Sequence, residues 1–362
     1  MARVVVGMSG GVDSSVAAYL LKKQGYDVLG LFMRNWHETA DDGNCSAEQD
    51  FADVRRVCKT LDIPYYTIDF SKEYFDRVFR VFLDEYGKGR TPNPDVLCNK
   101  EIKFDSFLRY ALSLEADYIA TGHYADVMRK DGKTYLLRAD DENKDQTYFL
   151  NQLKSEQLEK VIFPLAHIEK PEVRRIAAEL GLATAEKKDS TGICFIGERN
   201  FRRFLSEYLP MKDGDMIDVD TGRAVGRHTG VFYYTVGQRK GLGIGGGGNG
   251  QPWFVVKKDV ANNVLYVKQG DDDCLYRSGV YLPEFNFITD VLPDGEYKCL
   301  SRIRHRQPLV DSVMTVASGV VNLRFLTPVR GVACGQYAVA YFDKVCVGGG
   351  VIEDAFPVES AK

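Results

Sequence analysis

The segment GMSGGVDS at residues 7–14 combines glycines, hydroxyls and one carboxylate at a spacing that suits the binding of a polyphosphate. It follows a short apolar run and opens a helical pattern. Glycines let backbone N–H groups approach phosphate oxygens, Ser9 and Ser14 add hydroxyl donors, and a helix N-terminus adds positive partial charge. Asp13 is suited to holding Mg²⁺ against the phosphates. The segment therefore predicts a phosphate-binding loop, with a Gly-rich turn that binds nothing as the alternative.

The loop has no lysine where GxxxxGK[ST] requires one, so it is not the loop that directs transfer of a terminal phosphate. It resembles the SGGxDS signature of the PP-loop ATP pyrophosphatases, which cleave ATP between the α and β phosphates and transfer AMP to an oxygen. That resemblance implies ATP-binding residues at Gly7, Met8, Ser9, Gly10, Gly11, Val12, Asp13 and Ser14. It also implies that Met33 lies near the adenine and that Gly122 lines the same pocket, with plain core packing as the alternative for Met33.

Two of the eight cysteines stand in settings that could support thiol chemistry. Cys98 follows the Pro-broken segment TPNPDVL close to an expected helix N-terminus, where the dipole favours a thiolate. Cys194 lies in a Gly-flanked loop that could carry a thiol into and out of a pocket. Taken singly, each is more often a structural cysteine. With Asp95 as a third ligand the pair could instead bind a metal or an iron–sulfur cluster, although no close-spaced motif favours this.

Both cysteines fall in irregular segments of the region that holds the phosphate-binding loop, which suggests sulfur transfer. AMP attached to a carbonyl oxygen turns that oxygen into a leaving group, and a persulfide sulfur can replace it at the carbon. A second thiol can then form a disulfide with the first and free the sulfur as product.

Alternating strands and helices predict the architecture around these residues. The expected strands are 3–6, 28–33, 65–69 and 118–121, and the expected helices are 14–24, 45–61, 72–86, 100–114 and 170–180. Such alternation predicts a doubly wound, Rossmann-like parallel sheet whose ligand binds beyond the carboxyl ends of the strands. After about residue 205 the sequence becomes β-rich. We therefore expect a catalytic domain at 1–205, a small β-rich domain at 206–272 and an antiparallel β-barrel at 273–362.

Composition limits the class of protein. The chain of 362 residues has 44% hydrophobic residues and a formal charge of −4, so it can bury sizeable cores and is not a generic nucleic-acid coat. That charge still allows a localised basic surface for RNA. The N-terminus lacks the pattern of a signal peptide, and no apolar run could span a membrane. A cytoplasmic location is the expectation.

The resemblance becomes specific when the motifs are taken together. GMSGGVDSSVAA, TPNPDVLCN, TGHYA, KDQTYFL, DSTGICFIGER, VGQRKGLGIGG and GQYAVAYF resemble the tRNA-specific 2-thiouridylase family along nearly the whole chain. This implies a sulfurtransferase that uses ATP and Mg²⁺ to adenylate the 2-oxo group of the wobble uridine of tRNA and replaces that oxygen with sulfur. The resemblance makes Cys194 the persulfide-bearing cysteine, Cys98 the catalytic nucleophile and Asp95 an acid/base or orienting group. AMP and pyrophosphate would be released. A persulfide carrier protein or a cysteine desulfurase would supply the sulfur.

The same resemblance implies contacts with the RNA. Asn93, Pro94 and Asp95 match the segment that receives the target base, and His123, Lys144, Asp145, Gln146, Arg304, His305 and Gln336 match further tRNA contacts. An enzyme that acts on a base must splay it from its stack and hold the flanking backbone, which requires basic and aromatic groups. Without the resemblance, the RIRHRQ stretch at 302–307 would be interpreted as a strand with one solvated face.

Two other functions are also consistent with a phosphate-binding loop of this kind. A small-molecule ligase of the argininosuccinate or GMP synthetase type would need neither the thiol pair nor an RNA surface. A nucleotide-binding regulatory protein would carry out no chemistry, and release of AMP and pyrophosphate on addition of tRNA would exclude it.

Overall fold

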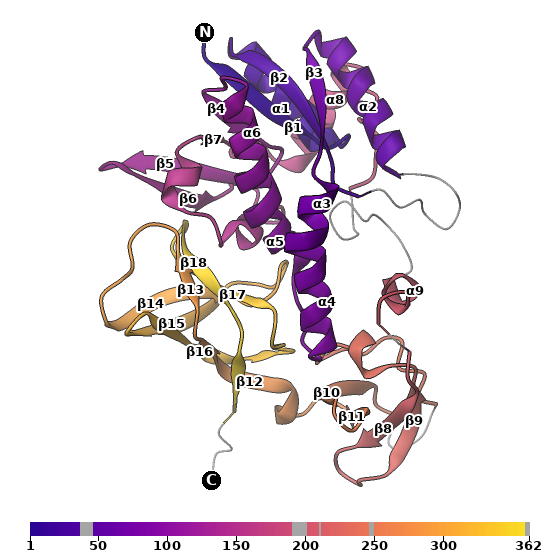
Figure 1. Cartoon of the computed structure of the whole chain (residues 1–362). Helices are drawn as coiled ribbons and strands as arrows, with labels where there is room; N and C mark the ends of the chain where they lie inside the picture. Colours follow the sequence, from indigo (N-terminus) through magenta and orange to yellow (C-terminus); the bar gives the residue numbers. More distant parts are fainter. Residues whose placement is uncertain (37–45, 190–200, 210, 246–249, 359–362) are drawn as a thin grey trace.

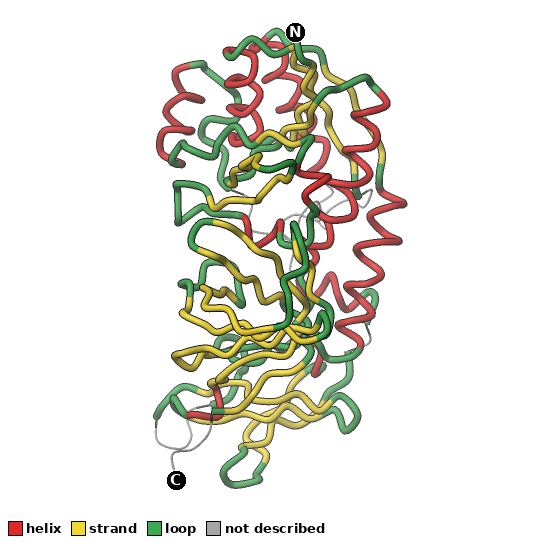
Figure 2. Tube along the Cα trace, turned by 90° about the vertical axis from the view of Figure 1, so that its left-hand side faces the viewer, coloured by secondary structure: helices red, strands yellow, loops and turns green. Residues whose placement is uncertain are grey.

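The computed structural model describes residues 1–36, 46–189, 201–209, 211–245 and 250–358 (Figure 1). Helices surround a sheet at the N-terminal end of the molecule, and strands dominate the C-terminal end (Figure 2). Within the described residues, no helix is both long and apolar enough to cross a bilayer.

The N-terminal part is built on a five-stranded sheet in the order β3-β2-β1-β4-β7. Its strands are β1 (Arg3–Met8), β2 (Asp27–Arg34), β3 (Tyr65–Asp69), β4 (Tyr118–Ala120) and β7 (Val161–Ile162), and every pairing is parallel. The predicted doubly wound parallel sheet is confirmed.

Apolar side chains alternate between the two faces of this sheet, as burial on both faces requires. Val4 and Val6 pack on the face covered by α1 (Val12–Lys23), α2 (Ser46–Leu61) and α8 (Lys170–Glu179). Val5 and Met33 pack on the opposite face with aromatic side chains of two helical segments. Those two segments are α3 (Ser71–Tyr74), η1 (Phe75–Phe79) and α4 (Arg80–Gly87), followed by α5 (Pro94–Cys98), η2 (Asn99–Ser106) and α6 (Phe107–Ser113). Helices therefore cover both faces and leave the carboxyl ends of the strands for a ligand.

A hairpin that the sequence does not predict connects the N-terminal α/β part with the C-terminal sheet. Strands β5 (Ala125–Lys130) and β6 (Lys133–Arg138) pair antiparallel, and β6 also pairs with β18 (Val345–Val351). The hairpin thus extends a C-terminal sheet of order β19-β12-β16-β15-β14-β17-β18-β6-β5, with β13 paired to β18. Its other strands are β12 (Tyr276–Leu282), β13 (Phe285–Phe287), β14 (Gly295–Arg302), β15 (Val310–Ala317), β16 (Val320–Arg330), β17 (Tyr337–Phe342) and β19 (Asp354–Pro357).

A smaller sheet lies between these parts along the chain. Its order is β10-β11-β8-β9, with β8 (Gly214–Asp218), β9 (Ala224–His228), β10 (Trp253–Asp259) and β11 (Val264–Gln269). The β-rich character expected after residue 205 and the antiparallel C-terminal architecture are both confirmed. The hairpin shows that the C-terminal sheet shares backbone hydrogen bonds with the segment that follows β4.

Candidate functional site

The phosphate-binding loop lies where the sequence predicts, between the end of β1 and the start of α1. Gly10 has φ +77°, and a Cβ atom there would lie 2.6 Å from the backbone oxygen of Asp50. Ser9 donates its backbone N–H to Ser14 Oγ at 3.2 Å, and Gly11 donates its N–H to Ser9 Oγ at 3.3 Å. Only glycine fits at position 10. The hydroxyls of Ser9 and Ser14 already hydrogen-bond to backbone N–H groups of the loop.

The loop that follows β4 closes against the start of α1. A Cβ atom on Gly122 would lie 2.6 Å from the backbone nitrogen of Ser14 and 2.8 Å from the carbonyl carbon of Asp13. On the other side, the Met33 methyl group lies 3.5 Å from where a Cβ on Gly7 would stand. The structure therefore brings these predicted ATP-binding residues together at the carboxyl ends of β1, β2 and β4.

Asp13 is the centre of an ion-pair network that the sequence does not predict. Lys170 Nζ lies 2.7 Å from both Asp13 carboxylate oxygens and 2.9 Å from Asp189. The Tyr124 hydroxyl donates to Asp13 at 3.0 Å, and burial together with the Asp13 charge raises the Tyr124 pKa. The Lys170 side chain is only 9% exposed, so this ammonium group is committed to the loop.

Asp189 extends the network toward the predicted RNA contacts. It accepts hydrogen bonds from Lys144 at 2.6 Å and from Arg174 at 2.7 Å. Partial burial opposes its ionisation, but the hydrogen bonds from Lys144 and Lys170 outweigh it and lower the Asp189 pKa. Lys144 is therefore linked to the nucleotide loop through one carboxylate.

A second lysine contacts the loop at Gly10. Lys187 Nζ lies 2.9 Å from the backbone oxygen of Gly10 and 2.6 Å from a carboxylate oxygen of both Asp50 and Asp53. Lys170 and Lys187 thus place two cations against the predicted phosphate-binding loop. Lys170 could have been suspected from the sequence, because it begins a helix that follows a strand; nothing near Lys187 gives such a signal.

Asp13 fits the predicted magnesium role only in part. Its two oxygens face Lys170, so a cation bound to Asp13 would compete with that ammonium group. Across the ranges that the structure describes, no three His, Cys, Asp or Glu side chains are grouped to hold a metal ion. A metal at this loop would therefore take most of its ligands from the nucleotide and water.

The segment predicted to receive the target base is capped at the start of α5. Asn93 Oδ1 accepts hydrogen bonds from the backbone N–H groups of Asp95, at 3.2 Å, and Val96, at 3.3 Å, and Pro94 takes the first helical position. Asp95 lies in the first turn. Cys98 is the last residue of α5, so it lies one turn beyond the N-terminus, where the helix dipole acts most strongly. Its side chain is fully buried. Cys194 lies outside the described residues.

Residues just before β17 of the C-terminal sheet hydrogen-bond to the backbone that precedes this segment. The backbone N–H of Thr91 donates to Cys334 O at 2.9 Å, and Gln336 Nε2 donates to Thr91 O at 3.0 Å. A Cβ on Gly335, which has φ +91°, would lie 2.9 Å from the Thr91 nitrogen. Gln336, predicted to contact tRNA, thus binds the backbone beside Asn93.

Other predicted RNA contacts differ in how exposed they are. The Asp145 side chain is buried, 3.2 Å from Arg302, and burial raises its pKa against the hydrogen bond from Thr147. Gln146 Oε1 accepts the backbone N–H of Tyr124 at 3.0 Å. Their roles in RNA binding stay predictions, and for Asp145 the carboxylate itself is engaged inside the protein.

His123 and His305 are both kept neutral by their surroundings. His123 Nδ1 lies 2.8 Å from the Thr121 hydroxyl, and burial, with the nearby Lys103 charge, lowers its pKa. The His305 ring packs on Phe149 with centroids 4.5 Å apart, and burial lowers its pKa to about 4. Arg304, beside it, is half-buried. Neutral imidazoles of this kind offer stacking surfaces and hydrogen bonds to bases rather than charge.

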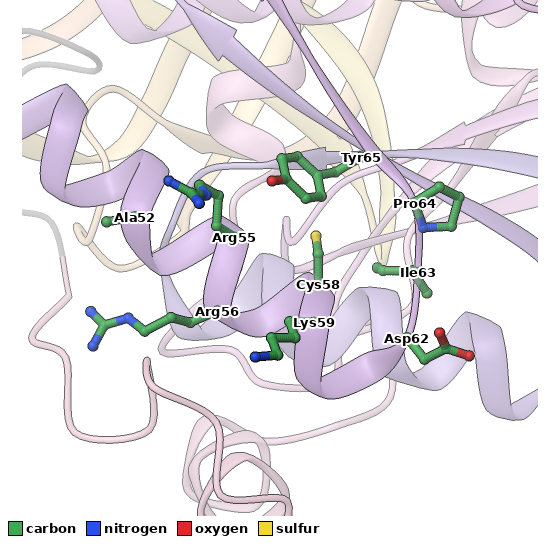
Figure 3. Close-up of a pocket in the computed structure, with 9 residues that line it drawn as sticks. All are labelled: Ala52, Arg55, Arg56, Cys58, Lys59, Asp62, Ile63, Pro64 and Tyr65. Carbon is green, nitrogen blue, oxygen red and sulfur yellow. The ribbon is translucent and has the colours of Figure 1, made fainter.

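A hollow of about 820 Å³ lies elsewhere, at the C-terminal end of α2 and the start of β3 (Figure 3). Arg55, Arg56, Lys59 and Tyr65 are among its lining residues. It occupies the edge of the sheet opposite the carboxyl ends of the strands, and no predicted site residue lines it.

Fold and loop together define an α/β protein with a Gly-rich loop at the carboxyl end of β1 and a β-rich C-terminal half. Residues 2–198 match the tRNA methyl transferase HUP domain family, residues 202–269 the matching PRC-barrel domain, and residues 277–352 an aminomethyltransferase beta-barrel domain. With relatives more than half identical along nearly the whole chain, this protein belongs to the tRNA-specific 2-thiouridylase family.

Those relatives include tRNA-specific 2-thiouridylase MnmA 2 of Geobacillus kaustophilus, which is 57% identical over 98% of this chain and 95% of its own length. The enzyme MnmA of Staphylococcus aureus is 55% identical over 99% of this chain and 96% of its own length. Among solved structures, a 4-thiouridine synthetase–RNA complex with bound ATP matches at 15% identity and a TM-score of 0.34, covering 52% of this chain and 43% of that one. That structural similarity is too low to support an argument.

Proposed function

We propose that this protein is an ATP-dependent tRNA sulfurtransferase that converts the wobble uridine to 2-thiouridine in the cytoplasm. The observation that carries the proposal is the 57% identity to a tRNA-specific 2-thiouridylase over 98% of the chain. It is supported by a nucleotide loop and a cysteine-bearing helix that belong to the same α/β unit.

The nucleotide loop, residues 7–14, would bind the phosphates of ATP. Its backbone N–H groups and the Ser9 and Ser14 hydroxyls donate, and the N-terminus of α1 adds positive potential. Lys170 and Lys187 contact the loop and would offset the charge that develops on pyrophosphate as AMP is transferred to the uridine 2-oxo group. Asp13 would contribute to holding Mg²⁺ when the nucleotide brings it.

The sulfur step uses two thiols. The terminal sulfur of a Cys194 persulfide would attack C2 of the adenylated uridine, and the C2–O bond to AMP would break. The Cys98 thiolate would then attack the Cys194 sulfur, which forms a Cys98–Cys194 disulfide and leaves the terminal sulfur on C2. A thiol reductant returns the disulfide to two thiols. Asp95, in the first turn of α5, would orient the base or move a proton.

The partners follow from this chemistry. A persulfide carrier protein or a cysteine desulfurase must reload Cys194 after every turnover. The substrate tRNA would contact Asn93 and Pro94 with its target base and the segments around His123, Lys144, Arg304 and Gln336 with its flanking nucleotides.

The test is formation of 2-thiouridine. Purified protein is incubated with ATP, Mg²⁺, a persulfide donor and unmodified tRNA, and the digested RNA is examined by mass spectrometry. We expect 2-thiouridine with the wild type, none with Cys194→Ser, and near-normal amounts with Cys274→Ser, a half-buried cysteine in the linker before β12. Full product from Cys194→Ser, or no product with any donor, would overturn the proposal.

The alternative is a small-molecule ligase of the argininosuccinate or GMP synthetase type. Such an enzyme would release AMP and pyrophosphate with a small nucleophile and without tRNA. Release that depends strictly on tRNA excludes it.

A further inference from the structure

Tyr148 lies where the predicted RNA-contacting segments meet. It belongs to the short helix η3 (Thr147–Leu150), which follows Lys144–Gln146 directly, and its side chain is completely buried. A buried phenol needs a partner for its hydroxyl, and that partner fixes where the ring can sit.

The Tyr148 hydroxyl faces acceptors from two further segments. Tyr337 O lies 3.1 Å away, Gln336 Oε1 3.3 Å away and Ile303 O 3.4 Å away. Ile303 precedes Arg304 and His305, and Gln336 is itself a predicted RNA contact. One hydroxyl therefore joins the catalytic part of the chain to two neighbouring segments of the C-terminal sheet.

The target-base segment, residues 93–95, follows Thr91, which is linked to the same hydroxyl through Gln336. Burial raises the Tyr148 pKa, and the Arg304 charge and hydrogen bonds with the Tyr337 backbone and the Asn93 side chain oppose that rise. Asn93 uses its Oδ1 to cap α5, while Gln336 donates to Thr91 O at 3.0 Å. The start of the helix that bears Asp95 and Cys98 is thus tied to Tyr148 through Gln336.

The neighbouring residue extends the arrangement to the other side of Cys98. Asn99 Nδ2 donates to Phe149 O at 3.0 Å, and the Phe149 ring packs on His305. The His305 ring also lies 6.3 Å from that of Tyr148, measured between ring centroids. Its buried Nδ1 has no hydrogen-bond partner within the part of the chain that the structure describes. Tyr148 and Phe149 therefore lie between the cysteine-bearing helix and the Arg304–His305 segment.

We propose that Tyr148 is a positioning residue for the thiolation reaction: its hydroxyl sets the target-base segment against the Arg304–His305 segment, so that RNA held by the C-terminal sheet delivers its uridine to Asp95 and Cys98. This inference rests on the proposed function. It assigns to the C-terminal sheet a second task beside RNA contact, which is to place the catalytic segment.

The test is Tyr148→Phe in the full-length enzyme, which keeps the ring and removes only the hydroxyl. Because RNA contacts remain while the reacting groups shift, kcat for 2-thiouridine formation should fall about tenfold or more, since small misplacements carry costs of this size. The KM for tRNA and the dissociation constant for ATP should stay within about twofold, since neither binding surface is removed.

The matched control is Tyr341→Phe. Tyr341 is equally buried, but among the described residues its hydroxyl has only a long contact of 3.4 Å with the Thr147 hydroxyl, so this variant should keep near-wild-type kinetics. Equal losses in the two variants, a rise in the KM for tRNA with unchanged kcat, or wild-type rates in Tyr148→Phe would each overturn the inference. Absence of 2-thiouridine with the wild-type enzyme would instead refute the proposed function.

Discussion

The nucleotide loop and the junction around Tyr148 are held together by different kinds of interaction. At the nucleotide loop, lysines bridge carboxylates at hydrogen-bond distance, with Lys170 between Asp13 and Asp189. At the junction, a phenol, two amides and stacked rings make neutral hydrogen bonds and van der Waals contacts. Charges suit a site that must accept and release a polyanion, whereas neutral contacts with defined directions suit a site that must hold two segments at a fixed separation.

The largest expected effect is that of removing the central cation of the nucleotide loop. Lys170→Gln leaves Asp13 and Asp189 facing each other at the loop. The unfolding free energy should fall by about 2 kcal/mol, less than for a fully buried pair because both carboxylates are partly exposed. The apparent affinity for ATP should fall about tenfold or more as a phosphate contact is lost. Urea denaturation and ATP titration measure the two effects.

Arg175→Gln is the control for this change, because Arg175 lies on the same helix in exposed ion pairs with Glu172 and Glu179. If Lys170→Gln and Arg175→Gln bind ATP equally well, ATP binding at the loop does not depend on the Lys170 charge. The proposed contrast with the neutral junction would then fail.

The next effect tests shape instead of charge at the same loop. Gly122→Ala places a methyl group against the backbone of Asp13 and Ser14, at 2.6 Å from the nearest atom. The loop after β4 and the start of α1 must therefore move apart. Overpacking of this kind costs about 1–2 kcal/mol of unfolding free energy. ATP affinity should fall about fivefold, because part of the displacement reaches Asp13 and Ser14 in the loop. Gly87→Ala is the control, since nothing lies within 4 Å of the added atom. Wild-type ATP binding by Gly122→Ala in a calorimetric titration would show that the loop tolerates displacement.

Local signals in the sequence predict the first region far better than the second. The strand, glycine turn and helix of the nucleotide loop are contiguous, so hydrophobic pattern and glycine spacing are enough to place Gly10 and Ser14. The Lys170–Asp13 pair spans 157 residues and the Tyr148–Gln336 pair 188, and no local pattern encodes such partners. The sequence does not predict the hairpin β5–β6 for a related reason: its first strand is half exposed, and its second is stabilised by pairing with β18.

A pH titration sharpens the contrast from the side of the junction. Burial, with the nearby charges of Arg306, Arg302 and Lys144, lowers the pKa of His305 to about 4 from its ordinary 6.5. Because the native state resists protonation, the unfolded state binds more protons between these values, and stability falls as the pH drops from about 6.5 to about 4. The loss should reach about 1–2 kcal/mol after allowance for partial exposure.

His305→Gln removes this loss, so the difference in unfolding free energy between wild type and variant should change across that pH window and be constant above it. Parallel stability curves from pH 7 down to about pH 4.5 would contradict the neutral burial of His305.

The smallest expected effect is a gain in stability where a charge lies outside any network. Lys258 Nζ, on β10, is buried and has no hydrogen-bond partner among the described residues, and burial lowers the Lys258 pKa to about 8. Lys258→Met should therefore raise the unfolding free energy by about 1 kcal/mol near neutral pH. The wild type regains stability as the pH rises from about 8 toward 10.5, because there the unfolded chain binds the extra proton, so the advantage of the variant should shrink in that window. Urea denaturation at about pH 7 and about pH 9.5, with the exposed neighbour Lys257→Met as control, measures this. A loss of stability in Lys258→Met at neutral pH would mean that this ammonium group, like Lys170, is paired, and the contrast between networked and isolated cations would fail.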